Sequence, residues 1–349
     1  MKNHITVLAT LLVLIFSLNG IVLAAGPMAQ PNLDLFPKVT DLGPLNFTGY
    51  VQSGYYHQFL DPDLLGTTDE NGDKVVGSTF NLDRVWFKMS GEISPIWGNL
   101  SYAIVADLLS ADSNVKQAWG AYSPGSWLQL KFGQQFVPFS RGFDYSPKTH
   151  PFLFYAGIEN DNNPCFQQGL SISGIFFGGV LEYYAAVYNG SGRSIDNNDH
   201  KDVSGRIDLT PIPNLTFSGA WRNGVNEFGA FNQATGFADY KIWQLQMVYT
   251  YFHQTQNDVL TDTEVTSEGH IGYLLLSPIP GHEQFMLTGR GDTNKPNVDE
   301  DLMIVTWTAG VNYDFGYGFS AIANYVNTDE RNSPEVKNDQ VGLQFEFAF

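Results

Sequence analysis

The chain is poor in cysteine and in charged residues. One of its 349 residues is Cys, and Asp, Glu, Lys and Arg together make up 15% of the chain. Because Cys165 is alone, no disulfide can form within the chain, and hydrogen bonds and packing must hold the fold. A low fraction of charged residues, combined with 14% Phe, Trp and Tyr, is typical of a protein whose outer surface faces lipid and whose rims carry aromatic girdles.

Basic residues are scarce even among the charged ones. The chain has 18 Lys and Arg against 36 Asp and Glu, which gives a formal net charge of −18 at pH 7. A nucleic-acid-binding protein needs a basic surface to meet phosphates. We therefore expect no nucleic acid as a partner.

Long apolar runs are missing after the amino terminus. The mean hydropathy is −0.15, and no later run approaches the roughly 20 apolar residues of a membrane-spanning helix. Near its start the chain has a basic residue, Lys2, followed by an apolar stretch over 5–23 and then by Ala24-Ala25-Gly26. This order predicts a secretory signal peptide over 1–24, followed by a short periplasmic leader over 25–44. The alternative is an uncleaved membrane anchor.

The last nine residues alternate strictly between apolar and small or polar side chains. Val341, Leu343, Phe345, Phe347 and Phe349 share one parity, and Gly342, Gln344, Glu346 and Ala348 share the other. A period of two predicts a strand with one apolar and one polar face. A final strand of this kind that ends in Phe resembles the closing strand of bacterial outer-membrane barrels. The alternative is a strand of a soluble antiparallel sandwich.

With this last strand included, the chain predicts sixteen strands, and the turn lengths decide their number. Strands are expected over 45–59, 79–93, 99–109, 115–122, 126–136, 165–176, 180–189, 202–209, 215–223, 229–254 (divided in two at Lys241-Ile242), 267–276, 283–292, 301–314, 317–328 and 339–349. With this division, short turns alternate with mostly longer polar loops, as in outer-membrane barrels. The prediction is an all-β fold: a closed antiparallel transmembrane β-barrel of 16 strands over 45–349. Fourteen or 18 strands are the alternatives.

The longest connection, over 137–164, is rich in aromatic residues. It contains Phe139, Phe143, Tyr145, Phe152, Phe154 and Tyr155. Because so aromatic a loop is unfavourable in water, we expect it to fold into the barrel as a constriction loop.

Several stretches resemble the phosphate-selective porin O and P family of bacterial outer-membrane porins. Residues 82–91 (LDRVWFKMSG) resemble its Arg-containing second strand, and 130–140 (LKFGQQFVPFS) resemble the signature that leads into its inward loop. Residues 187–192, followed by Gly205-Arg206-Ile207, and the later Gly310-Val311-Asn312-Tyr313 resemble further elements of the family in the same order.

The resemblance implies a 16-stranded trimeric channel that is often anion-selective. The chain departs from the family at Asp83, where paired basic residues are common, and at Phe154-Tyr155-Ala156-Gly157, which replaces an Arg-rich end of the inward loop. These departures concern selectivity for phosphate rather than the fold.

Parity also predicts which charged side chains line the pore. An Arg or Lys on the lipid face costs about 2–4 kcal/mol near the membrane midplane, so charges in mid-strand are expected to face the lumen. The expected pore-lining residues are Arg84, Trp86, Lys88, Asp107, Lys131, Arg206, Arg222 and Arg290, with Arg141 on the inward loop. We expect Arg84, Lys88, Lys131, Arg206 and Arg141 to form a positive band that attracts anions. The alternative is that they are ordinary charges paired with Asp107, Asp208 or acids of the loops.

No enzyme motif or metal-binding motif stands out, so neither catalysis nor a cofactor is expected. The chain has no His-Glu-x-x-His, Gly-x-Ser-x-Gly or phosphate-loop pattern. The acidic segment 61–73 contains Asp61, Asp63, Asp69, Glu70 and Asp73, but its spacing does not match a calcium loop, which favours a solvated loop over a divalent-cation site.

These patterns together predict a porin of the bacterial outer membrane. It is expected to let small hydrophilic solutes diffuse passively and to contact lipopolysaccharide and outer-membrane lipid. The resemblance further implies a preference for phosphate-like anions and a homotrimer. One alternative is a general, weakly selective or cation-preferring porin. The other is a structural or adhesive barrel whose lumen is plugged.

Overall fold

The structure, a computed structural model, describes residues 45–60, 77–94, 97–109, 115–196, 198–226, 228–258, 263–332 and 338–349. The expected signal peptide (1–24), the leader (25–44) and the acidic segment (61–73) lie outside the described residues. No helix in the described ranges is both long and apolar enough to cross a membrane.

The described ranges form sixteen β-strands and two short helices. The strands are β1 (Asn46–Gln58), β2 (Ser78–Ile93), β3 (Asn99–Asp107), β4 (Val115–Gly125), β5 (Leu128–Phe136), β6 (Phe166–Phe176), β7 (Leu181–Tyr188), β8 (Asp202–Ile212), β9 (Leu215–Asn226), β10 (Gly229–Ile242), β11 (Leu245–Asp258), β12 (Thr263–Leu276), β13 (Phe285–Lys295), β14 (Met303–Gly316), β15 (Phe319–Arg331) and β16 (Gln340–Ala348). The helices are α2 (Arg141–Asp144) and α3 (Gly157–Asn162), both in the connection between β5 and β6.

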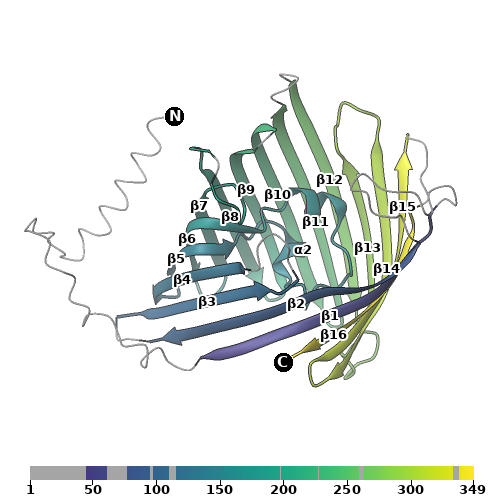
Figure 1. The fold of residues 1–349 in the computed structure, drawn as a ribbon, viewed down its shortest axis with the longest axis horizontal. Helices are drawn as coiled ribbons and strands as arrows, with labels where there is room; N and C mark the ends of the chain where they lie inside the picture. Colours follow the sequence, from purple (N-terminus) through teal and green to yellow (C-terminus); the bar gives the residue numbers. More distant parts are fainter. Residues whose placement is uncertain are drawn as a thin grey trace, which may run out of the picture. The chain divides into compact units, whose positions relative to one another are not determined.

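Each strand pairs with its neighbours in sequence, and β1 pairs with β16 to close the barrel (Figure 1). The closing pair is antiparallel over nine residue pairs, from Tyr50 opposite Ala348 to Gln58 opposite Gln340. Two further backbone hydrogen bonds of 2.9 Å join Gly49 and Phe349 in both directions. The prediction of a closed, antiparallel 16-stranded barrel is confirmed, and so is the pairing of the last strand with the first.

The two parities of the strands separate an outer apolar face from an inner polar face. On β1, Phe47 is 54% exposed on the outside, whereas Gln52 is 1% exposed on the inside. On β16, Phe345 and Phe347 are exposed on the outside, whereas Gln344 and Glu346 are buried on the inside. This arrangement lets the outside meet hydrocarbon while the inside keeps polar groups hydrogen-bonded.

The hairpin of β10 and β11 turns two residues later than the sequence predicts. The turn residues are Trp243 and Gln244 rather than Lys241 and Ile242, because Ile242 still pairs with Leu245. Trp243 adopts a left-handed conformation with φ of 50°. Two-residue hairpin turns usually place Asn or Gly in that conformation, so a Trp gives no turn signal in the sequence.

The closing seam should be sensitive to added volume at Gly49. A Cβ at Gly49 would lie 2.7 Å from the carbonyl oxygen of Trp86 and 2.7 Å from Cζ of Phe349. We expect Gly49→Val to destabilise the barrel by about 1–3 kcal/mol, as overpacking does elsewhere. The measurement is the temperature at which the compact, fast-migrating band on an SDS gel converts to the unfolded band.

Gly219→Val is the matched control, because Gly219 lies on the outer face of β9 and a Cβ there meets no atom within 4 Å. Equal conversion temperatures for the two variants would contradict the role given to the seam.

Candidate functional site

The connection between β5 and β6, residues 137–165, lies inside the barrel and is called the inward loop below. In Figure 1 its helix α2 lies within the ring of strands. One side of the inward loop packs on inner-face side chains of β9, β11 and β12 in a single apolar cluster, formed by Phe139, Phe152, Ala156, Ile158, Ala220, Val248, Phe252, Ile271, Tyr273 and Leu275. This side of the lumen is therefore a packed core rather than a water-filled space.

Ion pairs and hydrogen bonds fasten the inward loop to the barrel wall. Asp144 accepts two hydrogen bonds from the guanidinium of Arg206, at 2.7 and 2.8 Å. Arg141 pairs with Asp239 of β10 at 2.6 Å, and Nη1 of Arg290 donates to the carbonyl oxygen of Phe154 at 2.7 Å. Bidentate, largely buried pairs of this kind fix geometry as well as charge.

Glu159 joins the two short helices of the inward loop. Its side chain is 2% exposed, and its Oε1 accepts a hydrogen bond from the backbone N–H of Gly142 at 2.8 Å. Burial raises the pKa of Glu159 to about 7, although the Gly142 and Ser140 hydrogen bonds and the charge of Arg290 act in the opposite direction. Burial also lowers the pKa of His150 in the inward loop to about 4, so this imidazole is neutral at pH 7.

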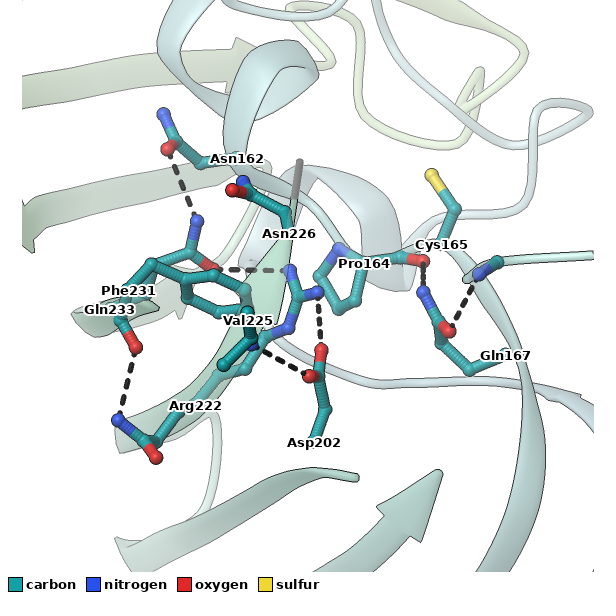
Figure 2. Close-up of polar contacts among 12 residues, drawn as sticks. Asn162, Pro164, Cys165, Gln167, Asp202, Arg222, Val225, Asn226, Phe231 and Gln233 are labelled. Carbon is teal, nitrogen blue, oxygen red and sulfur yellow. Dashed lines mark hydrogen bonds and ion pairs between the residues drawn. The ribbon is translucent and has the colours of Figure 1, made fainter. Parts of the chain in front are cut away.

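Arg222 is held in the wall by a cluster of its own, drawn in Figure 2. Its Nη2 donates to Oδ2 of Asp202 at 2.9 Å, and its guanidinium lies 4.4 Å from the ring centroid of Phe231. The nearby Gln233 connects this cluster to Asn162 of α3 by a hydrogen bond of 3.3 Å. Arg222 therefore supports the wall and, through Gln233, the inward loop.

The nine residues predicted to line the pore divide into paired and unpaired groups. Arg141, Arg206, Arg222 and Arg290 each form an ion pair, Arg290 with Asp292 at 2.9 Å. Asp107 pairs with Lys116 at 3.3 Å. Within the described residues, no ion pair involves Arg84, Lys88 or Lys131. The ammonium of Lys131 lies 4.6 Å from the ring centroid of Trp119.

Trp86 lies between Arg84 and Lys88 on the inner face of β2. Its ring centroid is 5.6 Å from that of Tyr50 on β1 and 6.2 Å from that of Phe166 at the start of β6. Arg84, Trp86 and Lys88 follow one another at two-residue spacing, which corresponds to about 7 Å per step along a strand. They form a row of two cations separated by an aromatic ring.

Two cavities are lined in part by residues of the inward loop. One, of about 790 Å³, lies at the end of the barrel with the short turns and is lined by residues of β3 to β8 and by Pro138 and Asp144 of the inward loop. The other, of about 450 Å³, lies at the opposite end and includes Tyr56, Asp83, Arg84 and Phe154. Among the described residues, no cluster of His, Cys, Asp and Glu could hold a metal ion.

Asp83 is a lumenal charge that parity alone misses. By strict alternation it should point outward, since Arg84 points inward. The register of β1 and β2 shifts between Gln52 and Ser53, and this irregularity brings both Asp83 and Arg84 to the inner face. No sequence signal marks the position of the shift.

Comparison with solved structures shows that the chain shares its fold with bacterial outer-membrane porins. The anion-selective porin from Comamonas acidovorans has a TM-score of 0.67 at 12% identity, covering 88% of this chain and 99% of that one. A trimer form of OmpT, an outer membrane protein of Vibrio cholerae, gives 0.66 at 14% identity, with 88% and 100% covered. The outer membrane channel DcaP of Acinetobacter baumannii gives 0.63 at 12% identity, with 90% and 99% covered.

The prediction of an outer-membrane β-barrel is thus confirmed at the level of the fold. No family model matches the chain, and no curated protein matches it. The finer resemblance to the phosphate-selective porins O and P stays a prediction.

Removing Arg290 should destabilise the barrel strongly. The side chains of Arg290 and Asp292 are each 3% exposed, so Arg290→Ala leaves a buried carboxylate without its partner, which costs about 3–5 kcal/mol. Arg331→Ala is the control, because Arg331 and Asp329 are about half exposed and such pairs contribute roughly 0–1 kcal/mol. Urea unfolding in detergent, followed by tryptophan fluorescence, measures the free energy of unfolding of both variants. Equal losses of unfolding free energy in the two variants would refute the structural role of Arg290.

Docking of the inward loop should depend on pH through Glu159. Because the pKa of the buried carboxyl lies above its ordinary value of 4.5, docking is most favourable below about pH 4.5 and weakens as the pH rises through about 7. Hydrogen exchange of residues 140–160, corrected for its intrinsic pH dependence, should show more protection at pH 5 than at pH 8. In Glu159→Gln, which cannot ionise, this difference should disappear; a difference that persists would assign the effect to another group, such as Asp144.

Proposed function

We propose that the chain is a porin of the bacterial outer membrane through which small hydrophilic solutes diffuse passively, with a preference for phosphate-like anions. The observation that carries this proposal is the distribution of lumenal charge. The arginines that lie in or beneath the inward loop are neutralised by acids, whereas Arg84, Lys88 and Lys131, on the inner faces of β2 and β5, form no ion pair among the described residues. Unpaired cations in a confined aqueous path raise the local concentration of anions.

The lumenal acids near Arg84 are engaged by neutral donors. Asp83 accepts hydrogen bonds from Tyr56 and Gln344, and Glu346 accepts one from Gln52. These bonds leave the negative charges in place, so the expected preference for anions is modest. The anion selectivity named for the Comamonas acidovorans porin is consistent with this proposal.

A homotrimer surrounded by lipopolysaccharide and outer-membrane lipid is the assembly that we propose. The exposed apolar side chains of the outer face, such as Phe80, Phe132 and Ile207, need lipid or a second subunit to cover them. The trimer form of the Vibrio cholerae protein supports three copies as the arrangement.

A weakly selective or cation-preferring porin is the second candidate. It is favoured by the formal charge of −18 and by the sharing of Arg206 between Asp144 and Asp208, which leaves one negative charge in excess there. The sign of the selectivity separates the two candidates.

The test is the reversal potential of the purified protein in planar bilayers under a KCl gradient. We expect chloride to be preferred in the wild type and the preference to fall in the double variant Arg84→Gln, Lys88→Gln. The preference for chloride over potassium should fall by up to about fivefold. This factor is the Boltzmann factor for about 1 kcal/mol, which is the interaction energy of an ion about 4 Å from a unit charge in water.

Arg331→Gln, which removes an exposed and already paired cation, is the matched control and should leave the reversal potential unchanged. A potassium preference that is the same in the wild type and the double variant would favour the second candidate. The absence of any step conductance would instead support a structural or adhesive barrel with a plugged lumen.

A further inference from the structure

Two adjacent residues of opposite charge share the inner face of the barrel. The irregularity of β2 opposite Gln52 and Ser53 turns both Asp83 and Arg84 inward. Oδ2 of Asp83 accepts hydrogen bonds from the hydroxyl of Tyr56 at 2.5 Å and from Nε2 of Gln344 at 2.7 Å, and both partners belong to the inner face. Neighbouring residues of a regular strand point to opposite faces, so this juxtaposition depends on the irregularity.

Asp83 and Arg84 form no ion pair with each other, and each has side-chain atoms without a hydrogen-bond partner in the part of the chain that the structure describes. Nη1 of Arg84 donates to Oε1 of Gln52 at 2.9 Å, and Nε2 of Gln52 is itself held by the carbonyl oxygen of Pro147 and by Glu346. Among the described residues, Nε and Nη2 of Arg84 and Oδ1 of Asp83 have no hydrogen-bond partner. The guanidinium is therefore held in position while part of its donor edge remains available.

These charges line a cavity that also has an aromatic side. The cavity of about 450 Å³ includes Tyr56, Leu153 and Phe154 beside Asp83 and Arg84. The rings of Tyr56 and Phe154 lie 5.7 Å apart at 56°, one on the wall and the other on the inward loop. A volume of about 300–1,000 Å³ with apolar walls and a few converging polar groups is typical of sites for small molecules.

Resting on the proposed porin function, we propose that this cavity is a binding subsite for α-amino acids with an aromatic or large apolar side chain. The carboxylate of the solute accepts hydrogen bonds from Arg84, its ammonium donates to Oδ1 of Asp83, and its side chain lies against Tyr56 and Phe154. A simple anion would be attracted by Arg84 but repelled by Asp83. A simple cation would be attracted by Asp83 but repelled by Arg84. A zwitterion satisfies both charges at once, which is how such a site discriminates among solutes.

The experiment is isothermal titration calorimetry of the full-length protein, folded in detergent, with L-phenylalanine, benzoate, phenethylamine and L-alanine. Phenylalanine should bind saturably and more tightly than the other three, each of which lacks one of the three recognised groups. Asp83→Asn and Arg84→Gln should each weaken phenylalanine binding by about ten- to a hundredfold, the loss expected for a hydrogen bond to a charged group.

Glu182→Gln is the matched control, because Glu182 lines the other cavity and should leave binding unchanged. The shift of the folded band on an SDS gel verifies that each variant is folded. If Asp83→Asn does not fold, Arg84→Lys takes its place. This variant keeps the charge but not the planar guanidinium, and it should weaken binding. Benzoate binding as tightly as phenylalanine, or no saturable binding of phenylalanine, would overturn the proposal.

Calorimetry and bilayer conductance together separate this proposal from the porin function on which it rests. A protein that conducts ions in bilayers but does not bind phenylalanine keeps the porin function and loses the subsite. A protein that binds phenylalanine but gives no step conductance keeps the subsite and loses the porin function.

Discussion

The whole structure depends on pairing every backbone polar group of the sheet without leaving an edge. In hydrocarbon an unpaired N–H or C=O costs several kcal/mol, so a sheet that crosses a membrane must close. The pairing of β1 with β16 meets this requirement, and Phe349 extends the seam by two backbone bonds to Gly49. Closure then gives the chain an outer face for apolar side chains and an inner face for polar ones.

Closure also creates an interior that the inward loop divides. On one side, Phe139 and Phe152 of the inward loop pack on apolar side chains of the wall. Ion pairs such as Arg206 with Asp144 hold the loop there, while Arg84 and Lys88 of β2 form no ion pair among the described residues. The lumenal cations therefore divide into a group that holds the inward loop and a group without an ion pair among the described residues, and in the proposed function only the second group bears on selectivity.

The alternation of the sequence predicted the barrel and its strand number. It did not predict the inward direction of Asp83, because a local shift of register has no signature in the pattern. It also did not predict that Arg206 meets Asp144, 62 residues away in sequence, since parity assigns a side of the sheet but not a partner across the lumen. The apolar inner-face residues Phe252 and Ile271 were hidden for the same reason: they belong to a cluster that includes Phe139 and Ile158 of the inward loop.

The central claim of the proposed porin function is that solutes pass along the side of the lumen lined by β2 and not beneath the inward loop. It is tested most directly by the effect of a negatively charged thiol reagent on the current of single-cysteine variants in a Cys165→Ser background. Lys88→Cys should react and lose current, whereas Val248→Cys, buried beneath the inward loop at 4% exposure, should not react. Reaction and block at Val248→Cys, with none at Lys88→Cys, would contradict the account.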